Sequence, residues 1–118
     1  MLTLEEVQRR VRAGEISEDQ GLLFANAAIA AHPSAAWWLF RGRLILLSEG
    51  SGYDLSEAEA SFLQAVAFEP ANPEPYEELG RYYDIQLEPE QARSYFRAAL
   101  ARGAGPECAA ALAAVKDE

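Results

Sequence analysis

The sequence contains one cysteine and one histidine among its 118 residues, and these scarcities exclude several kinds of site. Cys108 cannot form an intramolecular disulfide, and a thiolate metal cluster would need other ligands. His32 has no matched serine or cysteine nucleophile, and the Gly-Ser-Gly at 50–52 follows a helix rather than the strand that precedes a phosphate-binding loop. The sequence therefore predicts no enzyme, no metal site and no cofactor.

Long apolar runs are also missing. The longest candidate, AWWLFRGRLILL at 36–47, has twelve residues and carries Arg41 and Arg43 at its middle, whereas a membrane-spanning helix needs about 18–20 apolar residues. The N-terminus lacks the basic and apolar regions of a signal peptide. We therefore expect no membrane insertion and a cytoplasmic location. Cys108 is expected to act as a small buried hydrophobic residue.

Basic residues are scarce and unevenly placed. The net charge is -9, and residues 1–48 hold five acidic and five basic side chains, so the whole excess of acid lies in residues 49–118. A chain this acidic lacks the positive field that phosphate backbones and anionic membranes require. Nucleic acid is therefore not an expected partner, and the charge is interpreted first as a means of keeping the chain in solution.

Ala-rich segments between regularly spaced breaks predict an all-α fold. Helix starts are indicated by capping-box spacing at Thr3 and Glu6, Ser17 and Gln20, and Ser56 and Glu59. Breaks fall at 32–34, 69–75 and 103–106, where Pro and Gly interrupt the helical pattern. About seven helices are predicted, near 3–13, 17–31, 35–48, 56–68, 74–86, 89–102 and 106–116.

A repeated pattern of small and large residues joins these helices into hairpins. Tyr76, Leu79, Gly80 and Tyr83 are followed by Ala92, Phe96 and Ala99, and 34 residues earlier the same types recur as Ala58, Phe62 and Ala65. The helix before these holds Trp38 and Gly42 at the mutual spacing of Tyr76 and Gly80, and Pro70 follows the second helix. The pattern resembles the tetratricopeptide repeat family. The resemblance implies a right-handed α-α superhelix, with repeats at 1–33 (degenerate), 34–72 and 73–105 and a capping helix at 106–118, in one domain over 1–118.

Two departures from the family pattern stand out in the middle repeat: Arg41 replaces the usual Leu, and the turn at 48–55 is longer than usual. Trp38 is expected to pack inside its own hairpin and Trp37 against the preceding one. Small residues indicate the helix contact of the first repeat at Gly21, Ala25 and Ala28. The capping helix is expected to bury Cys108, Leu112 and Val115.

The resemblance implies that a partner lies in the concave groove lined by the first helix of each repeat. Helical spacing predicts an open apolar stripe in the middle repeat, comprising Leu39, Phe40, Arg43, Leu46 and Leu47. Arg10, Arg43 and Arg81 align along the groove; they could bind an acidic ligand, or be paired locally with Glu6 and Glu77, which leaves Arg43 the freest. Acidic residues cluster in the third repeat at Glu74, Glu77, Glu78 and Asp84.

The leading hypothesis is a non-enzymatic adaptor that binds a peptide or helix of another protein, with an apolar segment and a basic or polar segment, in this groove. An alternative is a structural module that forms homo-oligomers through the apolar stripe and the Ala-rich end helix. A second alternative is a small dedicated chaperone for a secreted or assembly substrate.

Overall fold

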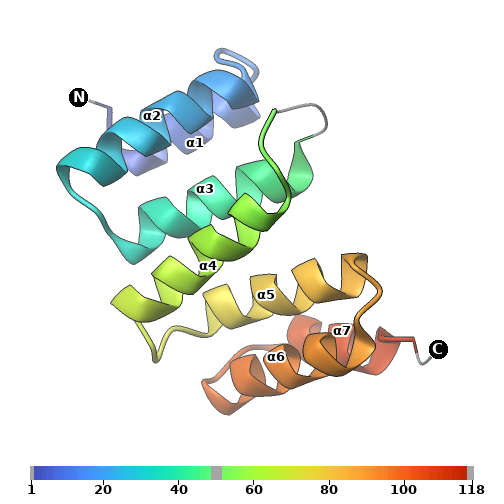
Figure 1. Cartoon of the computed structure of the whole chain (residues 1–118). Helices are drawn as coiled ribbons and strands as arrows, with labels where there is room; N and C mark the ends of the chain where they lie inside the picture. Colours follow the sequence, from blue (N-terminus) through green and yellow to red (C-terminus); the bar gives the residue numbers. More distant parts are fainter. Residues whose placement is uncertain (1, 49–51, 117–118) are drawn as a thin grey trace.

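The computed structural model describes residues 2–48 and 52–116. Within these ranges the fold is all-α, with seven helices and no strand, as predicted (Figure 1). The helices are α1 Leu4–Arg12, α2 Glu18–Ala31, α3 Ala35–Leu47, α4 Ser56–Phe68, α5 Pro73–Ile85, α6 Pro89–Ala101 and α7 Pro106–Ala114. The predicted turn at 48–55 includes residues 49–51, and the predicted cap includes 117–118; these lie outside the described residues.

Side-chain caps explain where several helices begin. The predicted capping boxes of Thr3 with Glu6 and Ser17 with Gln20 are both present, with hydrogen bonds in both directions. The box predicted for Ser56 and Glu59 is wrong. The backbone N–H of Ser56 instead donates to Oδ1 of Asp54 at 3.1 Å, because the chain turns one residue earlier and Ser56 is already helical.

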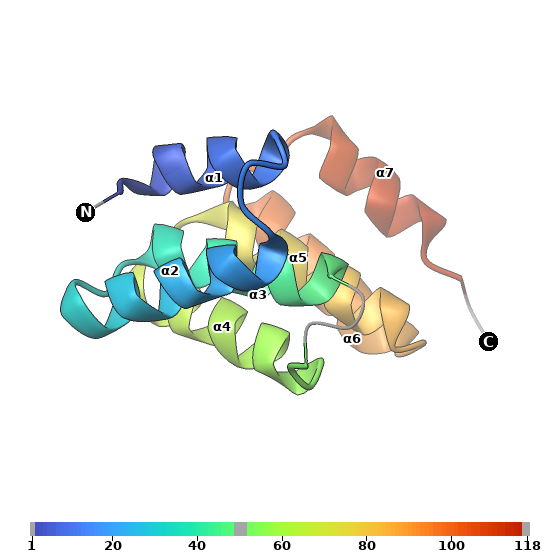
Figure 2. The ribbon, with the colours of Figure 1, turned by 90° about the horizontal axis from the view of Figure 1, so that it is seen from above.

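Each helix packs against its neighbours in sequence, as expected for stacked hairpins. Figure 1 shows α3 and α4 side by side, followed by α5 and α6. Seen from above, α1 and α7 both lie on one side of α3 and α5, and α4 lies on the other (Figure 2). This arrangement is consistent with a helical superhelix. The side of α3 and α5 on which α1 and α7 lie is called the hollow side.

Glycine sets the distance between helices in both complete hairpins. A Cβ atom on Gly42 would lie 2.5 Å from the ring of Phe62, and one on Gly80 would lie 2.6 Å from the ring of Phe96. Both rings are buried. Gly42 and Gly80 lie 38 residues apart and Phe62 and Phe96 lie 34 apart, because the turn of the middle repeat is longer, yet both hairpins make the same contact of glycine with an aromatic ring.

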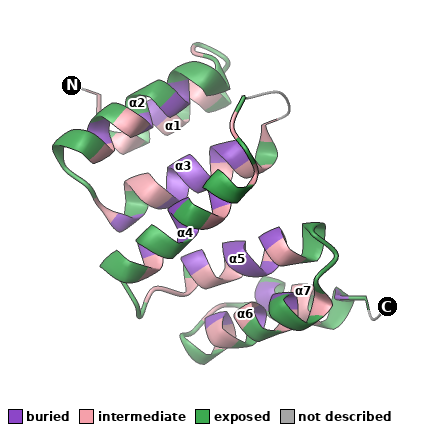
Figure 3. Cartoon of the chain, in the orientation of Figure 1, coloured by how far each residue is buried: buried purple, intermediate pink, exposed green. Residues whose placement is uncertain are grey.

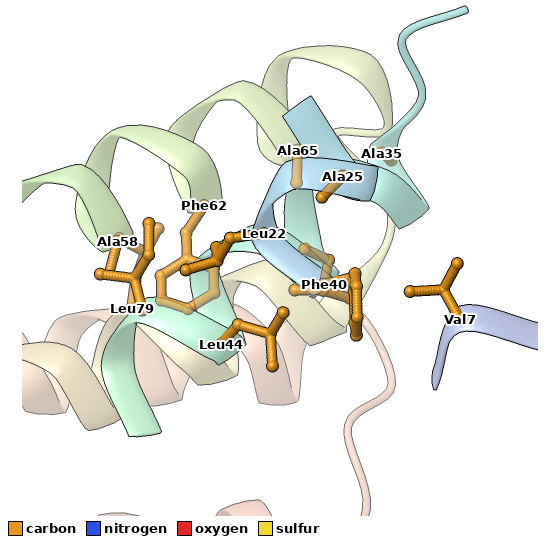
Figure 4. Close-up of a cluster of buried hydrophobic side chains, with 12 residues drawn as sticks. Val7, Leu22, Ala25, Ala35, Phe40, Leu44, Ala58, Phe62, Ala65 and Leu79 are labelled. Carbon is orange, nitrogen blue, oxygen red and sulfur yellow. The ribbon is translucent and has the colours of Figure 1, made fainter. Parts of the chain in front are cut away.

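Buried side chains from the first five helices form one hydrophobic cluster. Figure 4 shows Leu22, Phe40, Phe62 and Leu79, from α2, α3, α4 and α5, together in it. The motif residues that are buried are Gly42, Ala58, Phe62, Ala65, Leu79, Gly80, Ala92, Phe96 and Ala99, whereas Trp38, Tyr76 and Tyr83 are half-buried and Pro70 is exposed. The motif therefore marks the inside of the hairpins.

The C-terminal helix covers the last hairpin, as predicted. Cys108 and Val115 are buried in a second cluster with Ala92, Phe96 and Ala99, and Leu112 packs against it. Burial raises the pKa of the Cys108 thiol. Tyr83 packs against both clusters and so connects the two parts of the core.

Arg41 is the centre of a polar network that the sequence did not predict. Its guanidinium is buried and donates to Oδ1 of Asn26 at 2.8 Å, to Oγ of Ser61 at 2.6 Å and to a carboxylate oxygen of Glu57 at 3.0 Å. Asn26 in turn donates to the hydroxyl of Tyr53 at 2.8 Å. The network joins α2, α3 and α4, and Tyr53 anchors the C-terminal part of the long turn to them.

Candidate functional site: a depression on the hollow side

A depression of about 270 Å³ lies on the hollow side of the fold, between α1, the start of α2, and α3. Its lining residues are Gln8, Val11, Arg12, Glu18, Phe40, Arg43, Leu44 and Leu47. Apolar side chains thus form part of its wall, and two arginines and a glutamate supply charge. Three of the five predicted groove residues of the middle repeat contribute to it: Phe40, Arg43 and Leu47.

The predicted apolar stripe is less open than expected. Leu39 and Phe40 are only 5% and 6% exposed, and Leu46 is half-buried, so the prediction that they lie open is wrong. At Phe40 the cause is the close approach of α2: a Cβ on Gly21 would lie 3.1 Å from Leu44 and 3.8 Å from Phe40. Leu47 is 75% exposed and is the open member of the stripe.

The sequence suggested that Arg43 is the freest of the three aligned arginines, but the structure shows that it is paired. Its guanidinium lies 3.2 Å from a carboxylate oxygen of Glu74 and 3.5 Å from one of Glu78, both on α5. These pairs connect neighbouring hairpins, and sequence spacing within one helix could not reveal them. Arg43 therefore holds α3 to α5 while one side of it lines the depression.

The other two arginines differ from Arg43. Arg81 forms ion pairs with Glu77 and Glu78 of its own helix, which confirms the local pairing predicted for it. Arg10 has its Nε atom buried without a hydrogen-bond partner, and Glu6 bonds to Thr3 instead. The three arginines consequently do not form a row of equivalent cations.

Much of the acidic cluster of the third repeat is engaged by arginine. Glu78 is buried between Arg43 and Arg81, and Glu77 and Glu74 are paired with one of them each. Asp84 lies apart, at a second depression of about 170 Å³ whose other lining residues are Leu87, Pro89, Ala114 and Lys116. The negative charge that could attract a basic ligand over α5 is therefore smaller than the sequence predicted.

The contribution of α1 to the depression was misplaced by sequence reasoning. Aligning the repeats selected Arg10, whereas Gln8, Val11 and Arg12 line the depression. The spacing of these three residues is that of one helical face, so the signal was present. The first repeat is degenerate, and its weak motif positions led to the wrong alignment of α1 with the other repeats.

The tryptophans lie where predicted. Trp38 is half-buried and packs against the first cluster, and the guanidinium of Arg41 lies 5.8 Å from its ring centroid. Trp37 faces the preceding hairpin: together with Phe24 and Ala27 of α2, it lines an apolar depression of about 260 Å³. Neither tryptophan lines the depression between α1 and α3.

Three further observations bear on function. Within residues 2–48 and 52–116, no group of three or more His, Cys, Asp or Glu side chains is placed to hold a metal ion. None of the helices in that described part is long and apolar enough to cross a membrane. In comparisons with protein-family models, curated proteins and solved structures, no match to this chain was found.

Proposed function

We propose that the chain is a non-enzymatic binding scaffold that takes up a segment of another protein in the depression between α1 and α3. The observation that carries the proposal is the depression itself, which combines the apolar side chains of Val11, Phe40 and Leu47 with charged groups at Arg12 and Arg43. Binding sites for protein segments commonly place an apolar anchor beside a few polar groups that fix its orientation.

The lining residues suggest the chemistry of the bound segment. An apolar side chain would contact Phe40 and Leu47, and a neighbouring carboxylate would lie near Arg12, which is exposed. Arg43 is already shared with two glutamates of α5, so its field is partly neutralised. We therefore expect an apolar anchor with an acidic neighbour on the α1 side, and a polar rather than strongly basic continuation over α5.

The resemblance to tetratricopeptide repeats supports the same function, since hairpin arrays of that family bind peptides or helices on this side. Cytoplasmic location is part of the proposal and rests on the single, buried Cys108, which is compatible with a reducing compartment. A dedicated chaperone would use the same depression, and its substrate would carry the same anchor.

A test that distinguishes binding from folding uses two leucines with equal exposure. Leu47 and Leu87 are each 75% exposed, but only Leu47 lines the depression. Peptides selected from a random display library on the wild-type chain should lose at least tenfold in affinity for Leu47→Asp and keep their affinity for Leu87→Asp. Equal binding to the two variants would reject this depression as the site.

A further inference from the structure

The outward side of α2 is apolar, although a helix at the end of an array normally presents a polar side to water. Beyond its first two residues, the exposed residues of α2 recur at helical spacing and form a single face, the α2 face: Gln20, Leu23, Phe24, Ala27, Ala30 and Ala31. Five of these six are apolar. In an amphipathic surface helix this face would carry the charged residues.

The α2 face exposes large side chains as well as alanines. Leu23 is 68% exposed and Phe24 is 38% exposed. Phe24 and Ala27 also line the depression of about 260 Å³ that ends at Leu2 and Trp37, so the apolar surface continues beyond α2. Figure 3 colours most of the side of α2 that points away from α3 as exposed. A contiguous apolar surface of this kind is typical of an interaction site.

We propose that the α2 face binds the α2 face of a second copy of this chain, in a two-fold symmetric dimer. The distribution of charge favours this occupant. All of the net charge of -9 lies in residues 49–118, and residues 1–48 are neutral, with five acidic and five basic side chains. Two copies that meet through α2 therefore join their neutral parts and keep their acidic parts apart, which limits electrostatic repulsion.

The shape of the α2 face also suits a copy of itself. A two-fold interface brings the same patch of both subunits together, so the patch must be complementary to itself. Ala27, Ala30 and Ala31 leave room for a second helix at an ordinary separation of about 8–10 Å, and Leu23 and Phe24 of one copy can fill the space over the alanines of the other. Phe24 and Ala27 flank the middle of the α2 face, where the two-fold axis would pass.

This dimer differs from the self-association expected from the sequence, which used the middle repeat and the end helix. The hollow side, with Arg12 and Leu47, stays open to a bound segment, because the α2 face does not include its lining residues. Dimerisation and segment binding are therefore separable. A dimer would present two depressions, so a partner with two copies of the segment would bind more tightly.

Sedimentation equilibrium over a concentration series tests the proposal on the full chain. The wild type should form a dimer at high micromolar concentration, and Leu23→Glu should raise its dissociation constant at least tenfold. Leu87→Glu, which adds the same charge at an exposed leucine on another surface, should leave the constant unchanged. A strictly monomeric wild type would overturn the proposal and leave the α2 face to a different protein.

Cross-linking identifies the face even if Leu23→Glu unfolds. Cysteine is introduced in turn at Leu23, Ala27 and Ala30, with Ala60→Cys on the exposed side of α4 as the matched control. Under mild oxidation at least one α2 variant should form a disulfide-linked dimer faster than the control, and Cys108 should not compete because it is buried. Equal cross-linking at Ala60 would show that any dimer uses another surface.

Discussion

The ring of Phe62 occupies the space that a side chain on Gly42 would need. The same relationship exists between Phe96 and Gly80 in the next hairpin. In each case the ring is buried and cannot move aside without displacing other core residues. Because Gly42 of α3 and Gly80 of α5 lack a Cβ atom, the two helices of each hairpin can approach this closely.

Replacing Gly42 by Ala should therefore destabilise the fold. Overpacking costs about 1–3 kcal/mol, and Ala returns about 1 kcal/mol of helix propensity, so we expect a net loss of up to about 2 kcal/mol. Thermal unfolding measures this, and Gly80→Ala should behave alike. Adding Phe62→Leu to Gly42→Ala should recover part of the loss, and failure to do so would mean that the contact is not the cause.

Replacing Arg41 by Met should cost about 2–4 kcal/mol, because the buried hydroxyl of Ser61 and the part-buried acceptors on Asn26 and Glu57 lose a charged donor. Denaturant unfolding measures the effect, and Arg97→Met, at an exposed position on α6, is the control with little expected change. In a double-mutant cycle, Arg41→Met and Asn26→Ala should couple by more than about 0.5 kcal/mol. Simple additivity would contradict the network.

Alkaline pH should weaken the fold through Tyr83. Its hydroxyl donates to Glu59, and this bond, together with burial, raises its pKa well above the ordinary value of 10.0. A pKa raised in the folded state stabilises the fold below the unfolded pKa, and this contribution is lost as pH rises above about 10. Melting temperatures measured from about pH 8 to 11 should therefore fall at the alkaline end.

The matched variant for this pH dependence is Tyr83→Phe, which removes the titrating group. It should be less stable at neutral pH but should show a shallower alkaline decline than the wild type. Tyr82 and Tyr95 also have pKa values raised by burial, so some decline should persist. An identical slope in both proteins would exclude Tyr83 as a source of the effect.

Replacing Leu87 by Asn should stabilise the fold. Leu87 has a φ angle of 60°, in the left-handed region that costs a residue with a branched side chain about 1 kcal/mol and that Asn tolerates. Its side chain is largely exposed, so little burial is lost. We expect the melting temperature to rise by a few degrees, whereas Leu47→Asn, at an equally exposed leucine in α3, should give no increase.

Local patterns predicted much of this fold. The helix boundaries depend on caps and breaks a few residues apart, and the contact of Gly42 with Phe62 recurs in the next hairpin as that of Gly80 with Phe96. Such features are set by residues on one helix or one hairpin. The apolar residues around Cys108 in the sequence likewise predicted that it lies in the core, where the structure has it.

The candidate site was harder to predict because it depends on contacts between hairpins. Arg43 pairs with Glu74, 31 residues away, and no helical spacing connects them. Phe40 is covered because Gly21 lets α2 approach, and the sequence alone does not show how far a degenerate repeat covers its neighbour. The α2 face escaped notice because α2 is mostly apolar after its first turn, and such a helix gives no sign of which side is exposed.

The position of Tyr83 has a consequence for how the chain unfolds. Helical arrays can lose their end units one at a time when each unit contacts only its neighbours. Tyr83 belongs to the boundary of both hydrophobic clusters and bonds across to Glu59 of the preceding hairpin. Detaching the last hairpin therefore exposes part of the first cluster, and this shared side chain favours one cooperative transition over stepwise loss of units.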